Sequence, residues 1–562
     1  MLTRRDFLQV TAATAALLGS GVNIARAAAN QSITQKDLLK FDSVGQVTLL
    51  NFTDIHAQLM PLYFREPSVN LGVGEVFGLP PHITGEAFLK SFGLTAGTRD
   101  AYAFSSVDFS QLAGDYGKIG GLAQMATLIK AIRAERSPNT LLIDCGDTWQ
   151  GSYTSLATRG EDMVDVMNAL GVEVMVPHWE FTHGAERVLE LIEKLNFPFL
   201  AGNVIDNEWQ EKVFESTAHF ERGGVKIAVV GQAFPYTPVA NPRYMIPDWS
   251  FGIREDMVQE TINQARADGA ELVVFASHNG FDVDRKLAAR VTGIDVILTG
   301  HTHDAIPGVI EVKDTLLVAT GSHGKFLGRL DLDVQNGKIK NYNYKLMPIF
   351  SDAITPDPEI KAVVDGIRAP HQELLSEKLG RTDSVLYRRG NFNGTFDDLI
   401  CNAIMEERDT EIALSPGFRW GGSLLPGQDI TMDDLYNQTA ITYPSVYRND
   451  MTGENLKIIL EDVADNLFNI DPYYQQGGDM VRVGGMGYRI DINNKIGDRI
   501  SDMTLLSSGA PIDAKKSYVV GGWASVNKGT QGPPVFDLVA DYIRKKKVVN
   551  VQPNTNIKVV GA

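Results

Sequence analysis

The stretch Leu49-Leu50-Asn51-Phe52-Thr53-Asp54-Ile55-His56 begins as an apolar run typical of a strand and ends in two side chains that bind metals. Four later segments, at 141–147, 174–180, 273–280 and 296–303, repeat this pattern of an apolar run followed by Asp or His. In an α/β fold the ends of the strands meet at one edge of the sheet, where active-site groups gather. The pattern therefore predicts an α/β domain with a metal centre at that edge. The candidate ligands are Asp54, His56, Asp147, His178, His278, His301 and His303.

Seven such side chains can hold two divalent ions a few ångströms apart. Asp54 and His56 share one face of an extended segment because alternate residues point to the same side, and His301 and His303 do likewise. Asp147 follows an apolar run, where its carboxylate can bridge two ions. All the candidates are nitrogen or oxygen donors, which suit Mn²⁺, Zn²⁺ or Fe. A water between two ions ionises near neutral pH and becomes a nucleophile, so the sequence predicts a hydrolase.

Composition limits the class of protein. A chain of 562 residues is too long for one core, so two domains and an export segment are expected. The net charge of −17 argues against nucleic acid and against anionic membranes as general partners. The two cysteines, Cys145 and Cys401, are too few for a cysteine-based metal site, and Cys145 is expected in the core. After the export segment, no run approaches the roughly 20 apolar residues of a membrane span, so no membrane insertion is expected.

The N-terminus has the pattern of an export signal. Thr3-Arg4-Arg5-Asp6-Phe7-Leu8 is a twin-arginine motif, an Ala- and Leu-rich run follows, and Ala25-Arg26-Ala27 is a small-x-small cleavage site. These features predict a twin-arginine signal peptide at 1–27 and a periplasmic mature protein. The alternative interpretation is a basic start to an amphipathic helix.

The rest of the chain is expected to form two domains. Between 46 and 350, strand-like runs alternate with helical patterns. The insertion at 61–117 interrupts this alternation and is expected to cover part of the site or to contact a partner. A boundary and a linker, including one helix from Glu359 to Leu379, are expected at 351–379, and a Gly-rich second domain at 380–562. Helices of the first domain are expected at 121–134, 183–195 and 254–267.

Four short motifs carry a resemblance to a known family. Asp54-x-His56, Gly146-Asp147, Ser277-His278-x-Gly280 and Gly300-His301-x-His303 resemble the motifs of calcineurin-like metallophosphoesterases. After the signal, the whole chain is similar to the 5′-nucleotidase superfamily. This resemblance implies a four-layer αββα sandwich joined by a helix to a smaller α/β domain, with the active site between them. Together with the strand-end placement, it predicts one ion at Asp54, His56, Asp147 and His303, and another at Asp147, His178, His278 and His301.

One departure from the family pattern indicates a subfamily. The family usually has Gly-Asn-His-Glu-Phe-Asp, in which Asn is a ligand and the His and Asp assist catalysis. Here Pro177-His178-Trp179-Glu180-Phe181-Thr182 replaces the Asn ligand with His178 and removes the catalytic pair through Trp179 and Thr182. This pattern, together with 63–68, 389–398 and the twin-arginine motif, is similar to the SoxB-type sulfate thiohydrolases. That resemblance implies a dimanganese centre and a cysteine S-thiosulfonate substrate on the arm of the SoxYZ carrier protein.

The missing histidine agrees with such a substrate. Expelling an alkoxide benefits from a proton donor, whereas a cysteine thiol has a pKa of about 8.5 and leaves more readily as an anion. A metal-bridging hydroxide can then attack the sulfonate sulfur and release sulfate. Trp179 is expected to form an apolar wall that shields the reactive sulfur, although simple packing is the alternative role.

The second domain offers further candidates for contact with the substrate. Arg419 lies where nucleotidases bind substrate and can pair with a sulfonate oxygen, or else form an ordinary salt bridge. Asn391 and Tyr488 lie in Gly-rich segments expected to face the cleft. For two further histidines, His183 and His323, a position near the metal site is one of the alternatives.

Two other functions remain open from the sequence. The first is a periplasmic 5′-nucleotidase or nucleotide-sugar hydrolase, in which Phe392 or Phe418 stacks on a base. The absent His–Asp pair argues against it, and phosphate release from AMP tests it. The second is a non-catalytic, metal-dependent protein that binds the carrier, which turnover of any thiosulfonate would exclude.

Overall fold

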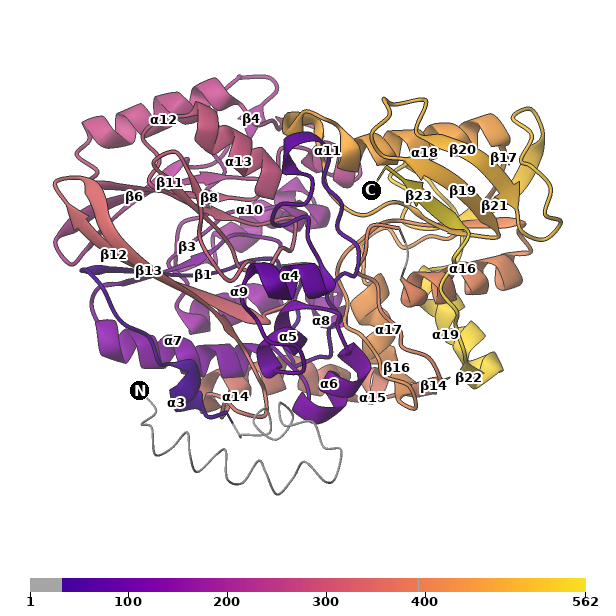
Figure 1. Ribbon diagram of the computed structural model, residues 1–562, viewed down its shortest axis with the longest axis horizontal. Coiled ribbons are helices and arrows are strands. Elements are labelled where there is room, and N and C mark those ends of the chain that lie inside the picture. The colour runs from indigo at the N-terminus through magenta and orange to yellow at the C-terminus, as the bar shows by residue number, and fades with distance from the viewer. Residues whose placement is uncertain (1–32, 393, 562) are drawn as a thin grey trace.

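The computed structural model describes residues 33–392 and 394–561, so the predicted signal peptide at 1–27 lies outside the described residues. Figure 1 shows two bodies side by side, the first built from the N-terminal half of the chain and the second from the C-terminal part. In the described part of the chain, no helix is both long enough and apolar enough to span a membrane.

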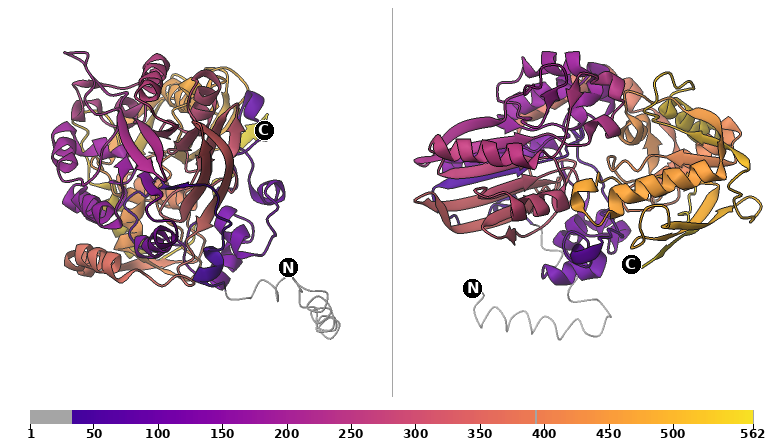
Figure 2. Two further views of the ribbon diagram at one scale, coloured as in Figure 1. Left: turned by 90° about the vertical axis from the view of Figure 1, so that its left-hand side faces the viewer. Right: turned by 90° about the horizontal axis from the view of Figure 1, so that it is seen from above.

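The first domain contains two sheets that face each other between outer helices, which is the predicted four-layer αββα sandwich (Figures 1 and 2). The first sheet has the order β13-β12-β1-β2-β3, and the second has the order β10-β11-β9-β8-β6-β5. The strands of the first sheet are β1 (Val47–Phe52), β2 (Thr140–Asp144), β3 (Val174–Met175), β12 (Phe326–Gln335) and β13 (Lys338–Pro348). Those of the second are β5 (Thr217–Arg222), β6 (Val225–Gln232), β8 (Leu272–Ser277), β9 (Val296–Thr299), β10 (Ile310–Val312) and β11 (Thr315–Ala319).

Strand alternation explains how each sheet buries both of its faces. In β1, Leu49 faces the opposite sheet, whereas Leu50 packs towards the helices. In β8, Val274 faces the opposite sheet, whereas Phe275 packs towards the helices. Both faces are apolar, so these strands appear in the sequence as nearly continuous hydrophobic runs. The outer helices are α7 (Leu122–Arg136), α9 (Glu161–Leu170) and α14 (Pro358–Arg368) beside the first sheet, and α12 (Glu255–Ala267) and α13 (Phe281–Arg290) beside the second.

The three helices predicted in the first domain are present as α7, α10 (Ala185–Ile192) and α12. The single linker helix predicted from Glu359 to Leu379 was wrong. Helix α14 ends at Arg368, a 3₁₀ turn spans Ala369–His371, and α15 covers Gln372–Leu375. Pro370 explains the break, because a proline inside a helix removes a hydrogen bond and clashes with the preceding turn. Leu379 belongs instead to strand β14 (Lys378–Thr382).

The insertion contributes helices α4 (Gly85–Ser91), α5 (Arg99–Phe104) and α6 (Phe109–Tyr116), which lie at the junction of the two bodies in Figures 1 and 2. A bridge between Leu62 and Ile119 closes its base, and Tyr63 pairs with Ser423 of the second domain. The insertion therefore contacts both domains.

The second domain is a smaller α/β unit with two apolar cores. Its central sheet has the order β17-β21-β15-β18. The strands of this sheet are β15 (Ile412–Ser415), β17 (Tyr447–Thr452), β18 (Arg482–Gly484) and β21 (Ser517–Gly522). The remaining strands are β14, β16 (Asp429–Thr431) and β22 (Val548–Val549) in one small sheet and β19 (Met486–Asp491), β20 (Ile500–Leu505) and β23 (Ile557–Val560) in another. Its helices of eight or more residues are α16 (Thr395–Arg408), α17 (Met432–Thr439), α18 (Gly453–Phe468) and α19 (Val535–Lys546).

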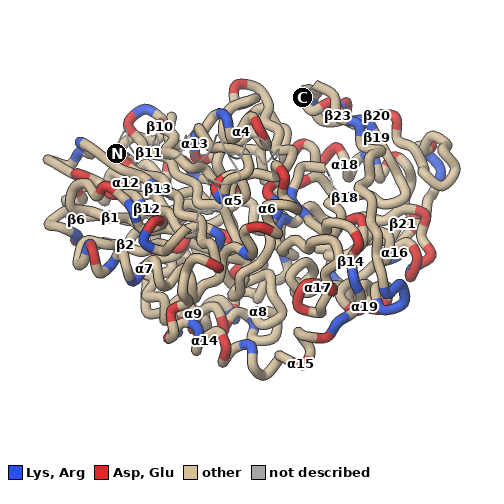
Figure 3. Tube along the Cα trace, turned by 60° about the horizontal axis from the view of Figure 1, so that its bottom comes forward, with Lys and Arg blue, Asp and Glu red and all other residues tan. Residues whose placement is uncertain are grey.

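Charged residues of both signs are interspersed along the trace in Figure 3. The last turn of α19 gathers basic residues, but Lys545 and Lys546 form ion pairs with Glu406 and Glu407. This basic segment is therefore partly neutralised within the chain itself.

Candidate metal centre

The predicted ligands meet where strands of the two sheets end. Asp54 and His56 follow β1, Asp147 follows β2, and His178 follows β3. His278 follows β8 of the second sheet, and His301 and His303 follow β9. All seven side chains are buried, and they gather in two groups that share Asp147. The structure thus brings together every residue of the predicted ligand set.

The loops that carry these ligands turn unusually tightly. Five of the seven ligands have a positive φ: 52° at Asp54, 49° at His56, 59° at Asp147, 75° at His301 and 59° at His303. Non-glycine residues seldom adopt this conformation, and such strain concentrates at functional sites. Backbone hydrogen bonds hold the turns, including those from the Asp54 N–H to the Gly146 carbonyl (2.7 Å) and from the His56 N–H to the Asp147 carbonyl (2.8 Å).

The first group contains Asp54, His56, Asp147 and His303, whose candidate donor atoms lie within 4.8 Å of one another. The Nε2 atoms of His56 and His303 are 3.0 Å apart, and the His303 Nε2 lies 3.1 Å from Asp54 Oδ1. These atoms converge on a common point, as ligands of one ion do.

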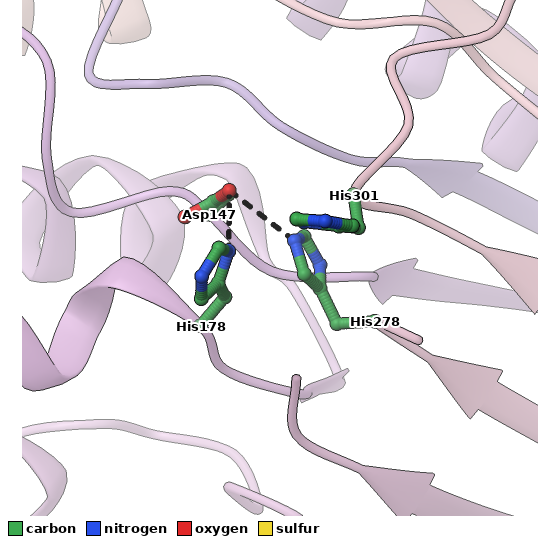
Figure 4. Close-up of side chains that lie close together, drawn as sticks. All are labelled: Asp147, His178, His278 and His301. Atoms are coloured by element: carbon green, nitrogen blue, oxygen red, sulfur yellow. Dashed lines mark hydrogen bonds and ion pairs between the residues drawn. The ribbon is translucent and has the colours of Figure 1, made fainter. Parts of the chain in front are cut away.

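The second group contains Asp147, His178, His278 and His301 (Figure 4). Asp147 Oδ2 lies 2.9 Å from His178 Nδ1 and 3.2 Å from His278 Nε2. It also lies 3.6 Å from His56 Nε2 of the first group. One carboxylate therefore reaches both groups, in the position of a bridging ligand.

Outer hydrogen bonds orient the imidazoles. The Nδ1–H of His278 donates to the Cys145 carbonyl, that of His56 donates to the Gln150 carbonyl (3.2 Å), and the Nε2–H of His301 donates to the Gln476 carbonyl (2.9 Å). In each ring the second nitrogen keeps a free lone pair, which is the usual arrangement of a metal-binding histidine.

Glu180 holds two of the ligand-bearing loops together. Its carboxylate accepts hydrogen bonds from the backbone N–H groups of His178 (2.6 Å), Thr148 (2.6 Å) and Trp149 (3.2 Å). The sequence pattern does not predict a role for Glu180. Its side chain lies near the ends of β2 and β3, so its partners became visible only in the fold.

The buried polar atoms fit bound cations. Among the described residues, Asp54 Oδ1 and His301 Nδ1 are buried without a hydrogen-bond partner. Buried polar atoms are normally paired, so each exception requires an explanation. A metal ion at each group supplies the missing partner, and the donor set of imidazoles and carboxylates suits divalent ions such as Mn²⁺, Zn²⁺ or Fe. The two clusters therefore fit a two-metal site.

The electrostatics of the site agree with this fit. Burial raises the pKa of Asp54 to about 7 and lowers that of His178 to about 4. Burial also opposes the charged form of Asp147, but the neighbouring His178, His56 and His278 outweigh it and hold the pKa well below its usual value. The neutral imidazole is the form that binds metals. At His278, burial favours the neutral form, but the carboxylates of Asp54 and Asp147 outweigh it and raise the pKa to about 9. The buried carboxylates therefore favour added positive charge, which a metal ion would supply.

A cavity of about 200 Å³ opens beside the centre, between the two domains. Asp147, His178 and His301 line one side, and Phe418 and Arg419 of the second domain line the other. Trp179 belongs to this lining and meets the rings of Phe418 and Trp420 edge to face, with centroids 5.5 and 5.3 Å away. The cavity wall next to the ligands is thus rich in aromatic rings.

The predicted second-domain residues differ in their positions. Arg419 lines the cavity and donates to the carbonyls of His301 and Thr302. Asn391 lines a smaller adjoining cavity, where its Oδ1 accepts from the Leu71 N–H (2.6 Å) and its Nδ2 donates to Asp479 (3.3 Å). Its contacts tie the insertion to the second domain.

Tyr488 does not face the cleft as expected. Its ring is buried in the core of the second domain, in strand β19. The physical reason is that the Tyr488 ring lies on the face of β19 that points inward, into the apolar core.

Of the two additional histidines, His323 packs against the metal ligands, whereas the contact of His183 is with a neighbouring loop. His323 lies with its ring centroid 5.6 Å from those of His56 and His303, and its Nε2 accepts from the Gly421 N–H (3.1 Å). His183 contacts the Trp149 carbonyl (3.1 Å) through Nε2. The insertion also reaches this region, because Phe64 lies 4.7 Å from His323 and Glu66 pairs with buried Lys325.

Comparisons with known proteins agree with the fold. Residues 378–538 match the family model of the 5′-nucleotidase C-terminal domain. The 5′-nucleotidase of Bos taurus is 24% identical over 512 residues, which cover 79% of this chain and 86% of that protein.

Two solved structures resemble the complete architecture. The sulfate thiohydrolase SoxB of Thermus thermophilus, in complex with glycerol, is 37% identical, with a TM-score of 0.90 over 93% of this chain and 98% of that chain. A 5′-nucleotidase precursor of Thermus thermophilus is 22% identical, with a TM-score of 0.72 over 92% of this chain and 100% of that chain, and shows the shared fold.

Proposed function

Because this chain belongs to the superfamily that includes 5′-nucleotidases and SoxB-type sulfate thiohydrolases, we propose that it is a sulfate thiohydrolase. The proposed substrate is a cysteine S-thiosulfonate on a SoxYZ-type carrier protein. Hydrolysis breaks the bond between the sulfane sulfur and the sulfonate sulfur and forms a new S–O bond from water. The products are sulfate, a proton and a carrier-bound sulfane sulfur.

One observation supports this substrate above the others. In the described part of the chain, every histidine that lines the cavity is a predicted metal ligand, and Trp179 occupies the adjoining wall. No cavity histidine is left to protonate a leaving group. An alkoxide needs such a proton donor, whereas a sulfur leaving group is stable as an anion because its acid is far stronger.

The metal chemistry is that of a two-ion hydrolase, and we propose manganese as the metal. When bound, two divalent ions lower the pKa of water and attract the oxygens of an anionic group. Asp54, His56 and His303 would hold one ion, and His178, His278 and His301 the other, with Asp147 between them.

The remaining residues position the substrate. The Arg419 guanidinium has five N–H donors, so after its two contacts with the ligand loop it retains donors for sulfonate oxygens. Trp179, Phe418 and Trp420 exclude water from the side of the cavity where the sulfane sulfur would lie. This apolar wall protects the persulfide product.

A 5′-nucleotidase is the second candidate. The match to the 5′-nucleotidase C-terminal domain and the curated nucleotidase relatives favour it. Phe418 lines the cavity and is available to a base, whereas Phe392 is buried against Phe468 and is not. Phosphate release from AMP distinguishes this candidate from the first.

We also propose export to the periplasm, from the twin-arginine motif at Arg4 and Arg5. Replacing both with Lys should retain the full-length precursor in the cytoplasm. Periplasmic protein from that variant would contradict the route.

The proposed activity is tested by sulfate release from a thiosulfonate-loaded carrier. Manganese-loaded protein should release about one sulfate for each loaded carrier, and chelated protein should release none. A carrier whose cysteine is blocked with an alkyl group is the matched control. No release from the loaded carrier by metal-replete protein would contradict the proposal.

A further inference from the structure

A strap of the second domain, Gln475–Asp479, lies against a metal ligand of the first domain. It connects the 3₁₀ turn Pro472–Tyr474 with β18. The Gln476 carbonyl accepts a hydrogen bond from His301 Nε2 at 2.9 Å. Gly477 has a φ of +73°, and a Cβ built there would lie only 2.6 Å from the same nitrogen. The close approach therefore requires glycine.

This contact determines which nitrogen of His301 can bind an ion. Because Nε2 donates its proton to Gln476, the lone pair must lie on Nδ1. That Nδ1 is buried without a hydrogen-bond partner among the described residues. The Phe234 ring stacks on the imidazole with its centroid 4.1 Å away. The strap and Phe234 together fix both the tautomer and the orientation of the ring.

The strap is itself held by its own domain. The Gly477 N–H donates to the Asn466 carbonyl (3.1 Å), and the Asp479 N–H donates to the Gly417 carbonyl (3.0 Å). Arg419, near Gly417, donates to the carbonyl of His301. The second domain thus holds His301 through both its ring and its backbone, and these contacts exist only while the two domains are docked.

We propose that the strap is a positioning element for His301 and that domain docking is linked to ion binding at the group of Asp147, His178, His278 and His301. Such linkage is reciprocal, so the ion stabilises the docked strap as much as the strap stabilises the ion. Loss of an outer partner of a ligand histidine typically costs 10–100-fold in metal affinity. The inference rests on the two-metal centre and not on the proposed substrate.

The test compares Gly477→Ala with Gly478→Ala. Both glycines have a positive φ, +73° and +86°, so alanine strains the backbone at each. A Cβ at Gly478 meets only the Gly417 carbonyl at 3.7 Å, well away from His301. Calorimetric titration of metal-free protein with Mn²⁺ should show that Gly477→Ala weakens one of two binding steps by about 10-fold or more. Gly478→Ala should retain both steps. Equal titrations of the two variants would overturn the proposal.

A second measurement uses the wild-type protein and does not depend on the folding of a variant. Hydrogen exchange of peptides that cover Gln475–Asp479 should be slower with Mn²⁺ than after chelation. The strand peptides of β20, in the second domain, are the control and should not change. Equal exchange of the strap in both states would overturn the linkage, while leaving the sulfate-release assay to decide the substrate.

Discussion

The two sides of the cavity are built in different ways. The metal edge of the first domain consists of side-chain donors placed at the ends of strands, as in Asp54 after β1 and His301 after β9. The facing wall of the second domain offers a guanidinium at Arg419, aromatic rings such as Phe418, and the backbone carbonyl of Gln476. The edge supplies what any two-metal hydrolase needs. Under the proposed function, this wall and Trp179 determine which leaving group and which substrate can react at the metal edge.

The largest effect is expected at the residue shared by both ion groups. Asp147→Asn removes the negative charge that reaches both groups, so both ions should be lost and turnover should fall by more than about 10³-fold. Metal analysis after dialysis measures the number of bound ions, and sulfate release measures turnover. His178→Ala is the comparison and should lose one ion only. Two tightly bound ions in Asp147→Asn would show that Asp147 is wrongly assigned as the ligand shared by both ions.

The next effect concerns the leaving group. Trp179→His with Thr182→Asp restores the pair that the family usually has, and a positioned general acid contributes about 10²–10⁴-fold. Hydrolysis of a small activated phosphate ester should therefore rise, while thiosulfonate turnover falls because the apolar wall is lost. Trp179→Phe is the control, which keeps the wall without adding an acid. If Trp179→Phe gains as much phosphatase activity as the double variant, the missing acid is not the reason for specificity.

A smaller effect is expected at the wall. Arg419→Lys keeps the charge but loses the fork that can pair with two sulfonate oxygens. The KM for a thiosulfonate should rise by about 10-fold, with metal content unchanged. Initial rates over a range of substrate concentrations measure it. An unchanged KM would limit Arg419 to holding the carbonyls of His301 and Thr302.

The smallest effect tests the insertion. Ser423 of the second domain accepts a hydrogen bond from the Arg65 N–H (3.0 Å), and a typical bond of this kind contributes about 1 kcal/mol. Ser423→Ala should loosen the insertion and raise the KM for the carrier by up to about 5-fold. The KM for a small thiosulfonate is the control and should not change. Equal changes in both would indicate a purely structural role.

Much of the metal edge could be predicted from the sequence, because each ligand follows an apolar run and the ends of strands must converge. The positive φ of Asp54, His56 and His301 could not be predicted, since only the packed loops impose it. The wall was harder to predict. Arg419 was placed correctly beside the cavity, but Tyr488 was not, because a Gly-rich segment does not reveal which face of its strand is buried. The role of Gln476 is carried by a backbone carbonyl, which leaves no trace in the sequence.

The most direct test of the account is a parallel assay of the wild-type protein loaded with Mn²⁺, using a thiosulfonate-loaded carrier in one reaction and AMP in the other. We expect steady release of sulfate, and phosphate release from AMP lower by at least about 10²-fold, because every cavity histidine in the described part of the chain is a predicted metal ligand and none is left to protonate an alkoxide. Comparable hydrolysis of AMP would contradict the account, since the cavity would then expel alkoxides with Trp179 in place.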